Sequence, residues 1–247
     1  MNTSLLTEKD IEVRIWEVQS NGMTAGKAMY THEGPALTCD WSKYWDLRTQ
    51  NPIGTVQLPE RCYTMDVNHP LMVVGTADRH LVVIDLNNPT VPFKSYLSPL
   101  KFQTRTVSCF PSKDGFAIGS IEGRVAIQYI QDSAKSNEFS FKCHRDTSNN
   151  VFAVNCISHH PLFGTFSTAG SDGNIMFWDK EARQKLKSFP CVNTPITSTC
   201  FNRDGRIFAY SVGYDWSKGY AHSNQNDKRT IYLHSVKEDD VKPRKRR

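Results

Sequence analysis

Short runs of alternating or continuous apolar residues, separated by turn residues, recur along most of this 247-residue chain. The clearest unit is Ala169–Asp179, in which the turn Ser171-Asp172-Gly173 joins two runs of strand-forming residues and the second run ends on Trp178-Asp179. An Asp-Gly turn between two such runs is typical of a β-hairpin. Weaker copies of the same phrase occur elsewhere, so the pattern predicts an all-β repeat protein whose unit is this hairpin.

The alternation of apolar and polar residues over Ile11–Val18 predicts a half-buried strand, and Lys27–Tyr30 and Pro35–Trp41 predict two more. Residues 1–10 are polar, and we expect them to form a disordered N-terminus. From residue 61 onward the pattern predicts a regular series of strands, at 61–67, 71–76, 80–86, 103–110, 115–120, 124–130, 139–144, 151–158, 164–169, 174–179, 185–189, 196–202, 207–213 and 229–235.

The ends of the Trp-Asp-type strands measure the length of the repeat. They fall at residues 16, 45, 84, 129, 178 and about 233, so the first separation is 29 and the next three are 39, 45 and 49. A repeat of about 40–45 residues with four strands and a Trp-Asp end is the signature of a WD40 β-propeller blade. The first separation is too short for a blade, and two residues alone separate Trp41 from Tyr44. We therefore expect about four complete blades and a truncated N-terminal portion, with blade strands missing near 42–44.

Composition and charge limit the functional classes. A hydrophobic content of 38% can build a packed core, and 14 Gly and 12 Pro fit many short strands. With no apolar run near the roughly 20 residues that span a bilayer, we expect no membrane insertion. Seven cysteines without a CxxC motif indicate a reduced intracellular compartment, with cysteines as small core residues. Residues 237–247 form a basic tail, which is either disordered, a nuclear-import signal or a nucleic-acid contact.

Several phrases are more specific than a generic blade. Those that resemble two related WD40 proteins, the nuclear-pore mRNA export factor and its cousin that binds the mitotic-checkpoint kinases, are Pro99–Arg105, Gly119–Ile127 and Phe141–Arg145. Those that resemble the export factor and not the checkpoint protein are Leu58–Tyr63, Trp178–Lys187 and Tyr214–Gly219. These phrases are long and lie outside the Trp-Asp positions that all propellers share, so the chain is identified as a member of the export-factor family.

This resemblance implies a seven-bladed propeller, here internally shortened, over residues 11–236. It implies docking of a GLEBS segment of an FG (phenylalanine–glycine repeat) nucleoporin, a contribution to poly(A) mRNA export, and a mitotic spindle role of family members. It also implies a location in the nucleus and at the nuclear pore, and in the cytoplasm. Since no catalytic constellation, phosphate loop or zinc spacing stands out, we expect a non-enzymatic scaffold with no cofactor, no metal and no small-molecule substrate.

Two candidate sites follow. Arg124, just past the hairpin tip that contains Glu122, is either a surface arginine paired with that glutamate or a guanidinium fork for a carboxylate of the acidic GLEBS segment. The resemblance favours the fork. The basic run after Trp178 is either a solvated loop or a groove for RNA (or an mRNP) or an acidic partner, and the resemblance favours the groove. This groove would consist of Phe141, Trp178, Lys180, Arg183, Lys185 and Lys187.

Other residues have structural interpretations or point to different functions. Trp45-Asp46-Leu47-Arg48 resembles the Trp-Asp-x-Arg box by which some propellers dock onto cullin ubiquitin-ligase adaptors. The alternative functions are therefore a substrate receptor or adaptor of such a ligase, and a mitotic checkpoint adaptor. We interpret Trp45 and Trp178 as packing residues whose indole N–H seeks a partner, and Asp172 as a turn residue that bonds its own backbone. His144 and His159 match no zinc spacing.

Overall fold

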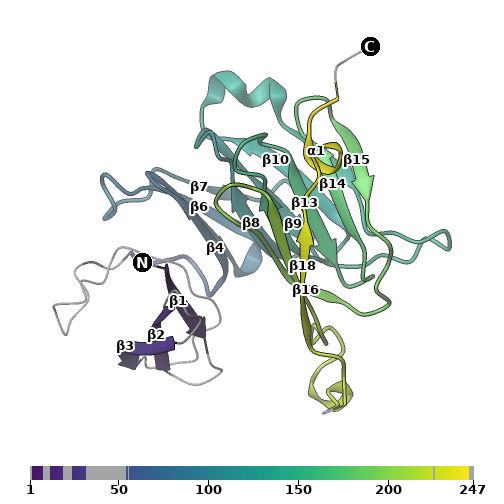
Figure 1. Cartoon of the computed structure of the whole chain (residues 1–247). Coiled ribbons are helices and arrows are strands. Elements are labelled where there is room, and N and C mark those ends of the chain that lie inside the picture. Colours follow the sequence, from purple (N-terminus) through teal and green to yellow (C-terminus); the bar gives the residue numbers. More distant parts are fainter. Residues whose placement is uncertain are drawn as a thin grey trace.

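Figure 1 shows the computed structural model of the chain. It describes the strands of residues 2–7, 12–18 and 24–31 by their backbone, and then residues 54, 56–224 and 226–244 in full. The described strands form antiparallel sheets, which confirms the predicted all-β class and a partial WD40 propeller.

Four sheets built from consecutive strands follow one another along residues 62–235. The first contains β4 (Cys62–Asn68), β5 (Leu71–Thr76), β6 (His80–Asp85) and β7 (Lys94–Leu97). The second contains β8 (Thr104–Cys109), β9 (Gly115–Ser120), β10 (Arg124–Tyr129) and β11 (Phe139–Lys142). The third contains β12 (Val154–His159), β13 (Phe166–Gly170), β14 (Ile175–Asp179) and β15 (Gln184–Ser188), and the fourth contains β16 (Ile196–Phe201), β17 (Ile207–Val212) and β18 (Thr230–Ser235). Within the described residues three blades thus have four strands and the last has three, one strand fewer than we predicted for a complete blade.

A separate three-stranded sheet precedes the blades. It has the order β1 (Asn2–Thr7), β2 (Glu12–Val18), β3 (Thr24–Thr31). Strands β2 and β3 match the predictions, whereas β1 lies where we expected a disordered N-terminus, because it pairs with β2 along its whole length. The predicted strand at 35–41 and the expected gap at 42–44 lie outside the described residues.

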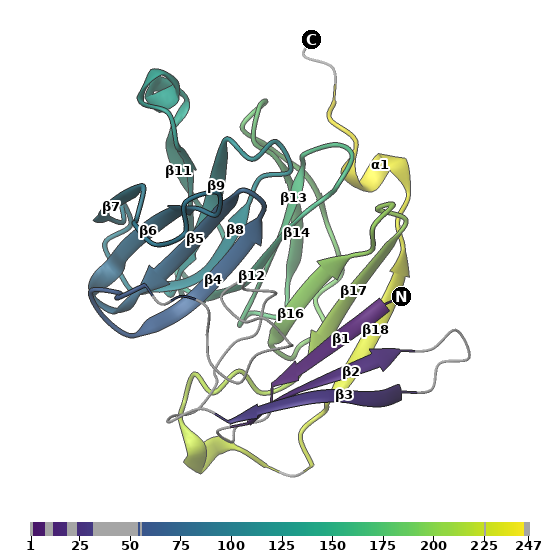
Figure 2. The same ribbon diagram turned by 90° about the vertical axis from the view of Figure 1, so that its left-hand side faces the viewer.

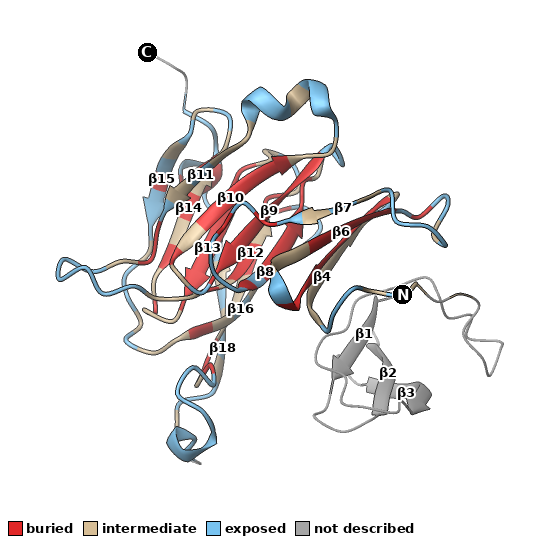
Figure 3. Cartoon of the chain, turned by 180° about the vertical axis from the view of Figure 1, so that it is seen from behind, coloured by how far each residue is buried: buried red, intermediate tan, exposed pale blue. Residues whose placement is uncertain are grey.

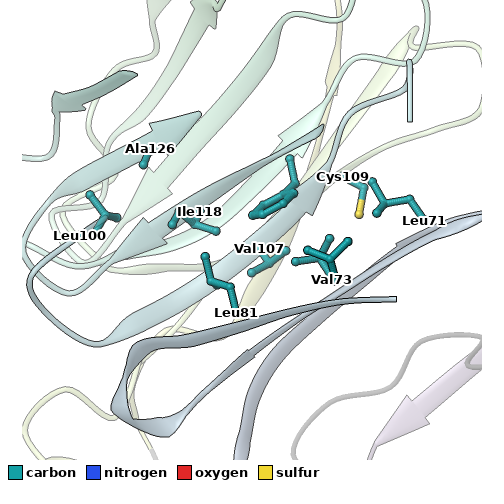
Figure 4. Close-up of a cluster of buried hydrophobic side chains, with 10 residues drawn as sticks. Leu71, Val73, Leu81, Leu100, Val107, Cys109, Ile118 and Ala126 are labelled. Atoms are coloured by element: carbon teal, nitrogen blue, oxygen red, sulfur yellow. The ribbon is translucent and has the colours of Figure 1, made fainter. Parts of the chain in front are cut away.

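The blades pack face to face around their innermost strands. β8 lies between β4 and β12, and β12 lies between β8 and β16, so the sheets succeed one another like the blades of a fan (Figure 2). The apolar cluster between the first two blades consists of Leu71, Val73, Leu81, Val83, Leu100, Val107, Cys109, Phe116, Ile118 and Ala126 (Figure 4). Successive side chains of a strand point to opposite faces of its sheet. Strand β9 is buried throughout because its blade has a neighbouring blade on each side, and β5 is buried throughout because its blade has a neighbouring blade on one side and Val56 and Leu58 on the other.

The two ends of the blade stack differ. On the free face of the first blade, Met72 and Val82 are buried, since Val56 and Leu58 pack against them. On the free face of the last blade, Ile231 and Leu233 are 74% and 73% exposed. A blade buries its faces only against its neighbours, and no described residue covers this second face.

The C-terminal segment is docked rather than disordered up to Arg244. It contains the short helix α1 (Glu238–Val241), in which Asp240 and Val241 are buried. The Thr165 hydroxyl donates to the Val241 carbonyl over 2.6 Å, and Arg244 Nη2 donates to the Leu186 carbonyl over 2.7 Å. Residues 245–247 lie outside the described part. The remaining short elements are the 3₁₀ turns η1 (Ala77–Arg79), η2 (Asp132–Asn137) and η3 (Tyr220–His222).

Candidate functional site

The candidate sites are positioned by the hairpin topology of the blades. Because neighbouring strands are antiparallel, the connections between second and third strands all lie at one face of the stack, which we call the tip face. The connections between first and second strands lie at the opposite face. The tip face therefore carries residues 121–123 between β9 and β10, residues 171–174 between β13 and β14, and the long connection from β17 to β18.

Arg124 is the first residue of β10 and stands at the tip face. Gly123 before it has a φ of 61°, and a Cβ there would come within 2.7 Å of the Cys143 carbonyl oxygen, so the tight tip requires glycine. Arg124 Nε lies 3.6 Å from Glu122 Oε2, and the two side chains are 31% and 14% exposed. The pair is a single-point contact through Nε, which leaves the outer nitrogens of the guanidinium group available for a bidentate contact.

Arg145, for which the sequence predicted no role, holds the backbone of this hairpin tip. Its Nη2 donates to the Glu122 carbonyl over 2.9 Å. Arg145 Nε and Glu122 Oε1 are both buried and have no hydrogen-bond partner among the described residues. Buried polar atoms of this kind are normally satisfied, so the tip has unused donor and acceptor capacity beside Arg124. Arg145 does lie in the phrase Phe141–Arg145, which carries the family resemblance, and this is the signal that could have found it.

Four of the six residues predicted for the groove lie close together in the structure. Phe141 of β11 and Trp178 of β14 come together from neighbouring blades, with ring centroids 4.6 Å apart and planes inclined by 49°. Arg183 is exposed, and its Cζ lies 4.7 Å from the centroid of the Phe139 ring. Lys185 is exposed and pairs with Trp178 in the strand register. These four side chains, with Phe139, make an aromatic and basic rim, which we call the outer rim.

Lys180 and Lys187 do not belong to the outer rim as free cations, contrary to the prediction. Lys180 is 9% exposed, lies 4.8 Å from the centroid of the Phe110 ring, and pairs with Glu181. Burial disfavours its charge, but the hydrogen bond to Glu181 and the neighbouring Tyr129 raise the pKa of Lys180 overall. Lys187 pairs with the buried carboxylate of Asp240 in α1. Each ammonium group thus forms an ion pair within the chain, so the outer rim has fewer cations available for a partner.

A buried chain of hydrogen bonds connects Trp178 to the tip face. The Trp178 indole N–H donates to the Thr168 hydroxyl over 2.9 Å, and that hydroxyl lies 3.0 Å from His144 Nε2. His144 Nδ1 in turn lies 2.8 Å from Asp172 Oδ1. Burial alone disfavours the charged carboxylate, but the hydrogen bonds from His144 and Asn174 hold the pKa of Asp172 below its ordinary value. This chain, which we call the histidine relay, is a structural element of the third blade.

The relay agrees with the structural interpretation of Trp178 and extends that of Asp172. Asp172 Oδ1 accepts from the Asn174 backbone N–H at 3.1 Å, as predicted for a turn residue, and it also holds His144. The sequence pattern does not link His144 to Asp172, because Asp172 lies 28 positions later. Trp45, Asp46 and Arg48 lie outside the described residues.

Among the described residues, no group of three or more His, Cys, Asp or Glu side chains could hold a metal ion. No helix there is long and apolar enough to cross a membrane.

Comparison with known proteins places the chain among relatives of one kind. The WD40 family (WD domain, G-beta repeat) matches residues 135–179. The chain is 44% identical to the poly(A)+ RNA export protein of Schizosaccharomyces pombe, with 95% of this chain and 84% of the relative covered. It is 45% identical to the mRNA export factor GLE2 of Chaetomium thermophilum, with 95% and 83% covered. It is 52% identical to protein RAE1 of Arabidopsis thaliana, with 81% of this chain and 58% of the relative covered.

The lengths of these alignments also bear on the shortened propeller. The alignment with the Schizosaccharomyces pombe protein is 297 positions long, whereas this chain has 247 residues. At least 50 of those positions must therefore be gaps in this chain, so this chain lacks residues that the relative has. The identity extends over most of both proteins, and the resemblance stated above is confirmed: this chain belongs to the WD40-repeat family of mRNA export factors.

Proposed function

We propose that this chain is a non-enzymatic interaction scaffold that acts in poly(A) mRNA export at the nuclear pore by binding the GLEBS segment of an FG nucleoporin. The names of its relatives support the export role. The observation that carries the peptide site is Arg124, which stands at the tip face and is held through Nε alone. The proposed locations are the nuclear pore and nucleus, with a cytoplasmic pool.

The proposed binding step is a bidentate hydrogen bond. A carboxylate of the acidic segment accepts from the guanidinium edge of Arg124 that Glu122 leaves unused. Arg145 holds the backbone of the tip through the Glu122 carbonyl, so Arg124 is presented in one orientation. We assign the outer rim to an acidic protein partner rather than to RNA. Its two exposed cations, Arg183 and Lys185, lie beside the tilted rings of Phe141 and Trp178, an arrangement that suits an acidic peptide.

Calorimetric titration of the whole chain with a GLEBS peptide tests this site. We expect Arg124→Glu to abolish binding, because it replaces the fork with a like charge. Arg206→Glu is the matched control: Arg206 also follows an acid and a glycine at a hairpin tip, its Nε lies 3.9 Å from Asp204 Oδ2, and its tip lies at the opposite face. Unchanged affinity in Arg124→Glu, or an equal loss in both variants, would contradict the proposal.

The export role is tested separately in Schizosaccharomyces pombe cells depleted of their poly(A)+ RNA export protein. We expect this chain to reduce the nuclear accumulation of poly(A) RNA, as seen by hybridisation in fixed cells, and Arg124→Glu to fail. Accumulation that persists with a stably expressed wild-type chain would refute the export role. The ligase alternative gains no support from the described residues, since Trp45–Arg48 lies outside them.

A further inference from the structure

The last blade ends in an open strand edge. Its strand order is β16-β17-β18, so β18 stands third and no described strand pairs with its outer side. Each of the other three blades carries a fourth strand at this place, namely β7, β11 or β15. Strand β18 has no buried residue, whereas β9 and β13 are buried throughout, and Figure 3 shows β18 at the margin of the stack. Within the described residues, the last blade therefore lacks the strand that completes the others.

The outer side of β18 presents backbone hydrogen-bonding groups. The Val236 N–H donates to the Arg206 carbonyl, so the even-numbered residues of β18 turn their N–H and C=O groups toward β17. Alternate residues of an antiparallel strand turn these groups to opposite sides, so those of Ile231, Leu233 and Ser235 point to the open edge. No described strand pairs with them. Such an edge is a template for a further strand.

A pocket lies beside this edge, on the side that faces the third blade. It has a volume of about 360 Å³ and lies between the end of β15 and the strands β17 and β18. Its walls include Phe189 and Val192 of the third blade and Tyr210 and His234 of the last. A cavity of roughly 150 Å³ holds a benzene ring, so this pocket has room for an apolar side chain. A strand beside β18 would point every second side chain to the face on which His234 lies.

The charges at the two ends of β18 differ. The exposed cations Lys228 and Arg229 precede the strand, and Asp227 beside them is half-buried and accepts a hydrogen bond within its own loop. The exposed acids Glu238 and Asp239 follow the strand. A segment that is antiparallel to β18 would place its C-terminal end next to Lys228 and Arg229. Acidic residues at that end would complement the edge, because opposite charges on neighbouring strands attract.

We propose that β18 binds an extended segment of another protein, which pairs antiparallel with it as a fourth strand. The segment is apolar at its centre, because one set of alternate side chains enters the pocket and the other covers Ile231 and Leu233. It ends in acidic residues opposite Lys228 and Arg229. Main-chain hydrogen bonds supply the affinity, and the pocket supplies the specificity. This site goes beyond the proposed function and shares no residue with the GLEBS site at the tip face.

Another protein fits this edge better than this chain or a second copy of it. Each described strand of the chain already belongs to a sheet, so none of them is spare. Symmetric pairing of β18 with its own copy would put both third blades on the same face of the joined sheet. Each third blade has one strand more than the last blade, so the two β15 strands would meet in the same space.

The test uses a fluorescein-labelled peptide, Ser-Thr-Leu-Val-Ile-Val-Thr-Glu-Asp, titrated with the whole chain and followed by fluorescence anisotropy. In the proposed register its Leu lies opposite His234, its first Val opposite Leu233, and its Glu opposite Arg229. Proline in place of the first Val removes the N–H that bonds to the Leu233 carbonyl, so binding should weaken by roughly 2- to 13-fold, the range for one hydrogen bond. A peptide that ends in Lys-Lys should also bind more weakly.

Two variants of the chain test the edge itself. Leu233→Pro removes an N–H from the open edge and leaves the bonds to β17, so peptide binding should weaken while the chain stays folded, since edge strands tolerate proline. The matched control is Leu97→Pro in the edge strand β7. Leu97 is 52% exposed, and its N–H also points outward, because the Ser98 N–H donates to the Arg79 carbonyl. Arg229→Glu should weaken binding of the acidic peptide and strengthen binding of the Lys-Lys peptide.

Hydrogen exchange of the Ile231 and Leu233 amides, followed by NMR, locates the bound peptide, which should slow both. Four results would overturn the proposal: no peptide binding, equal binding of the proline peptide, equal loss in Leu233→Pro and Leu97→Pro, and slow exchange of both amides in the chain alone. In the last case, dependence on chain concentration would assign the edge to a second copy, and independence would assign it to a segment of this chain. Failure of the proposed GLEBS site is distinguishable, since Arg124→Glu should bind this peptide normally.

Discussion

Replacing Thr168 with valine removes one hydroxyl at the centre of the histidine relay while nearly preserving the shape of the side chain. Thr168 is fully buried, and its hydroxyl serves both the Trp178 indole N–H at 2.9 Å and His144 Nε2 at 3.0 Å. In the valine variant both ring nitrogens lose their partner at once. The His144 ring has no access to water, whereas the half-buried Trp178 has some.

The expected cost follows from these two environments. A buried donor or acceptor without a partner costs about 1–3 kcal/mol, which applies to His144, and the loss of an ordinary hydrogen bond costs about 0.5–1.5 kcal/mol, which applies to Trp178. We therefore expect Thr168→Val to lower the free energy of unfolding by about 2–4 kcal/mol. That is a large part of the roughly 5–15 kcal/mol that stabilises most domains.

Urea unfolding followed by circular dichroism measures this effect, and Thr104→Val is the matched control. Thr104 is 1% exposed, and its hydroxyl is buried without a hydrogen-bond partner among the described residues. The same substitution there removes a polar group that makes no bond, so it should be neutral or stabilising. If both variants lose the same stability, or if Thr168→Val stays within about 0.5 kcal/mol of the original chain, the relay does not support the fold as argued.

Burial lowers the pKa of His159 to about 3, so between about pH 6.5 and pH 3 only the unfolded chain binds a proton at this residue. The free energy of unfolding should therefore fall by up to about 1.4 kcal/mol for each pH unit below about 6.5. The variant His159→Gln should show a smaller slope of unfolding free energy against pH. The double variant Ile231→Lys, Leu233→Lys should reduce self-association of the chain, measured by light scattering. The thermal midpoint should change little, because both side chains are largely exposed. Unchanged scattering would show that this face of the last blade does not mediate self-association. Asp240→Ala should speed hydrogen exchange over residues 237–244 while the blades stay protected, because the buried Asp240 carboxylate binds Lys187 and His234. Slow exchange over residues 237–244 in this variant would show that other contacts hold α1.

Much of the fold could be predicted from local patterns in the sequence. The strands after residue 61 were predicted to within a few residues, because a strand packed in a blade alternates its faces and the Gly and Asp turns mark its ends. Strand β7 was missed, because Lys94–Leu97 is only four residues long and its sequence, Lys-Ser-Tyr-Leu, does not alternate apolar and polar residues. The phrases that identify the family were equally accessible, because they depend only on residue identity.

The sequence by itself determined the blade repeat, the family and the position of Arg124 at a hairpin tip, because each of these depends on residues close together along the chain. The partners of the charged residues were decided only by the tertiary structure. Lys187 meets Asp240 across 53 positions, and Arg105 meets Asp215 across 110. The basic run after Trp178 therefore predicted more free cations than the structure has. Residues 214–219, identified in the sequence only as part of a family phrase, are held through Asp215 by residues far away in the sequence. The physical reason is that charge and shape act through space: a cation is available to a partner only where packing has left it unburied and unpaired.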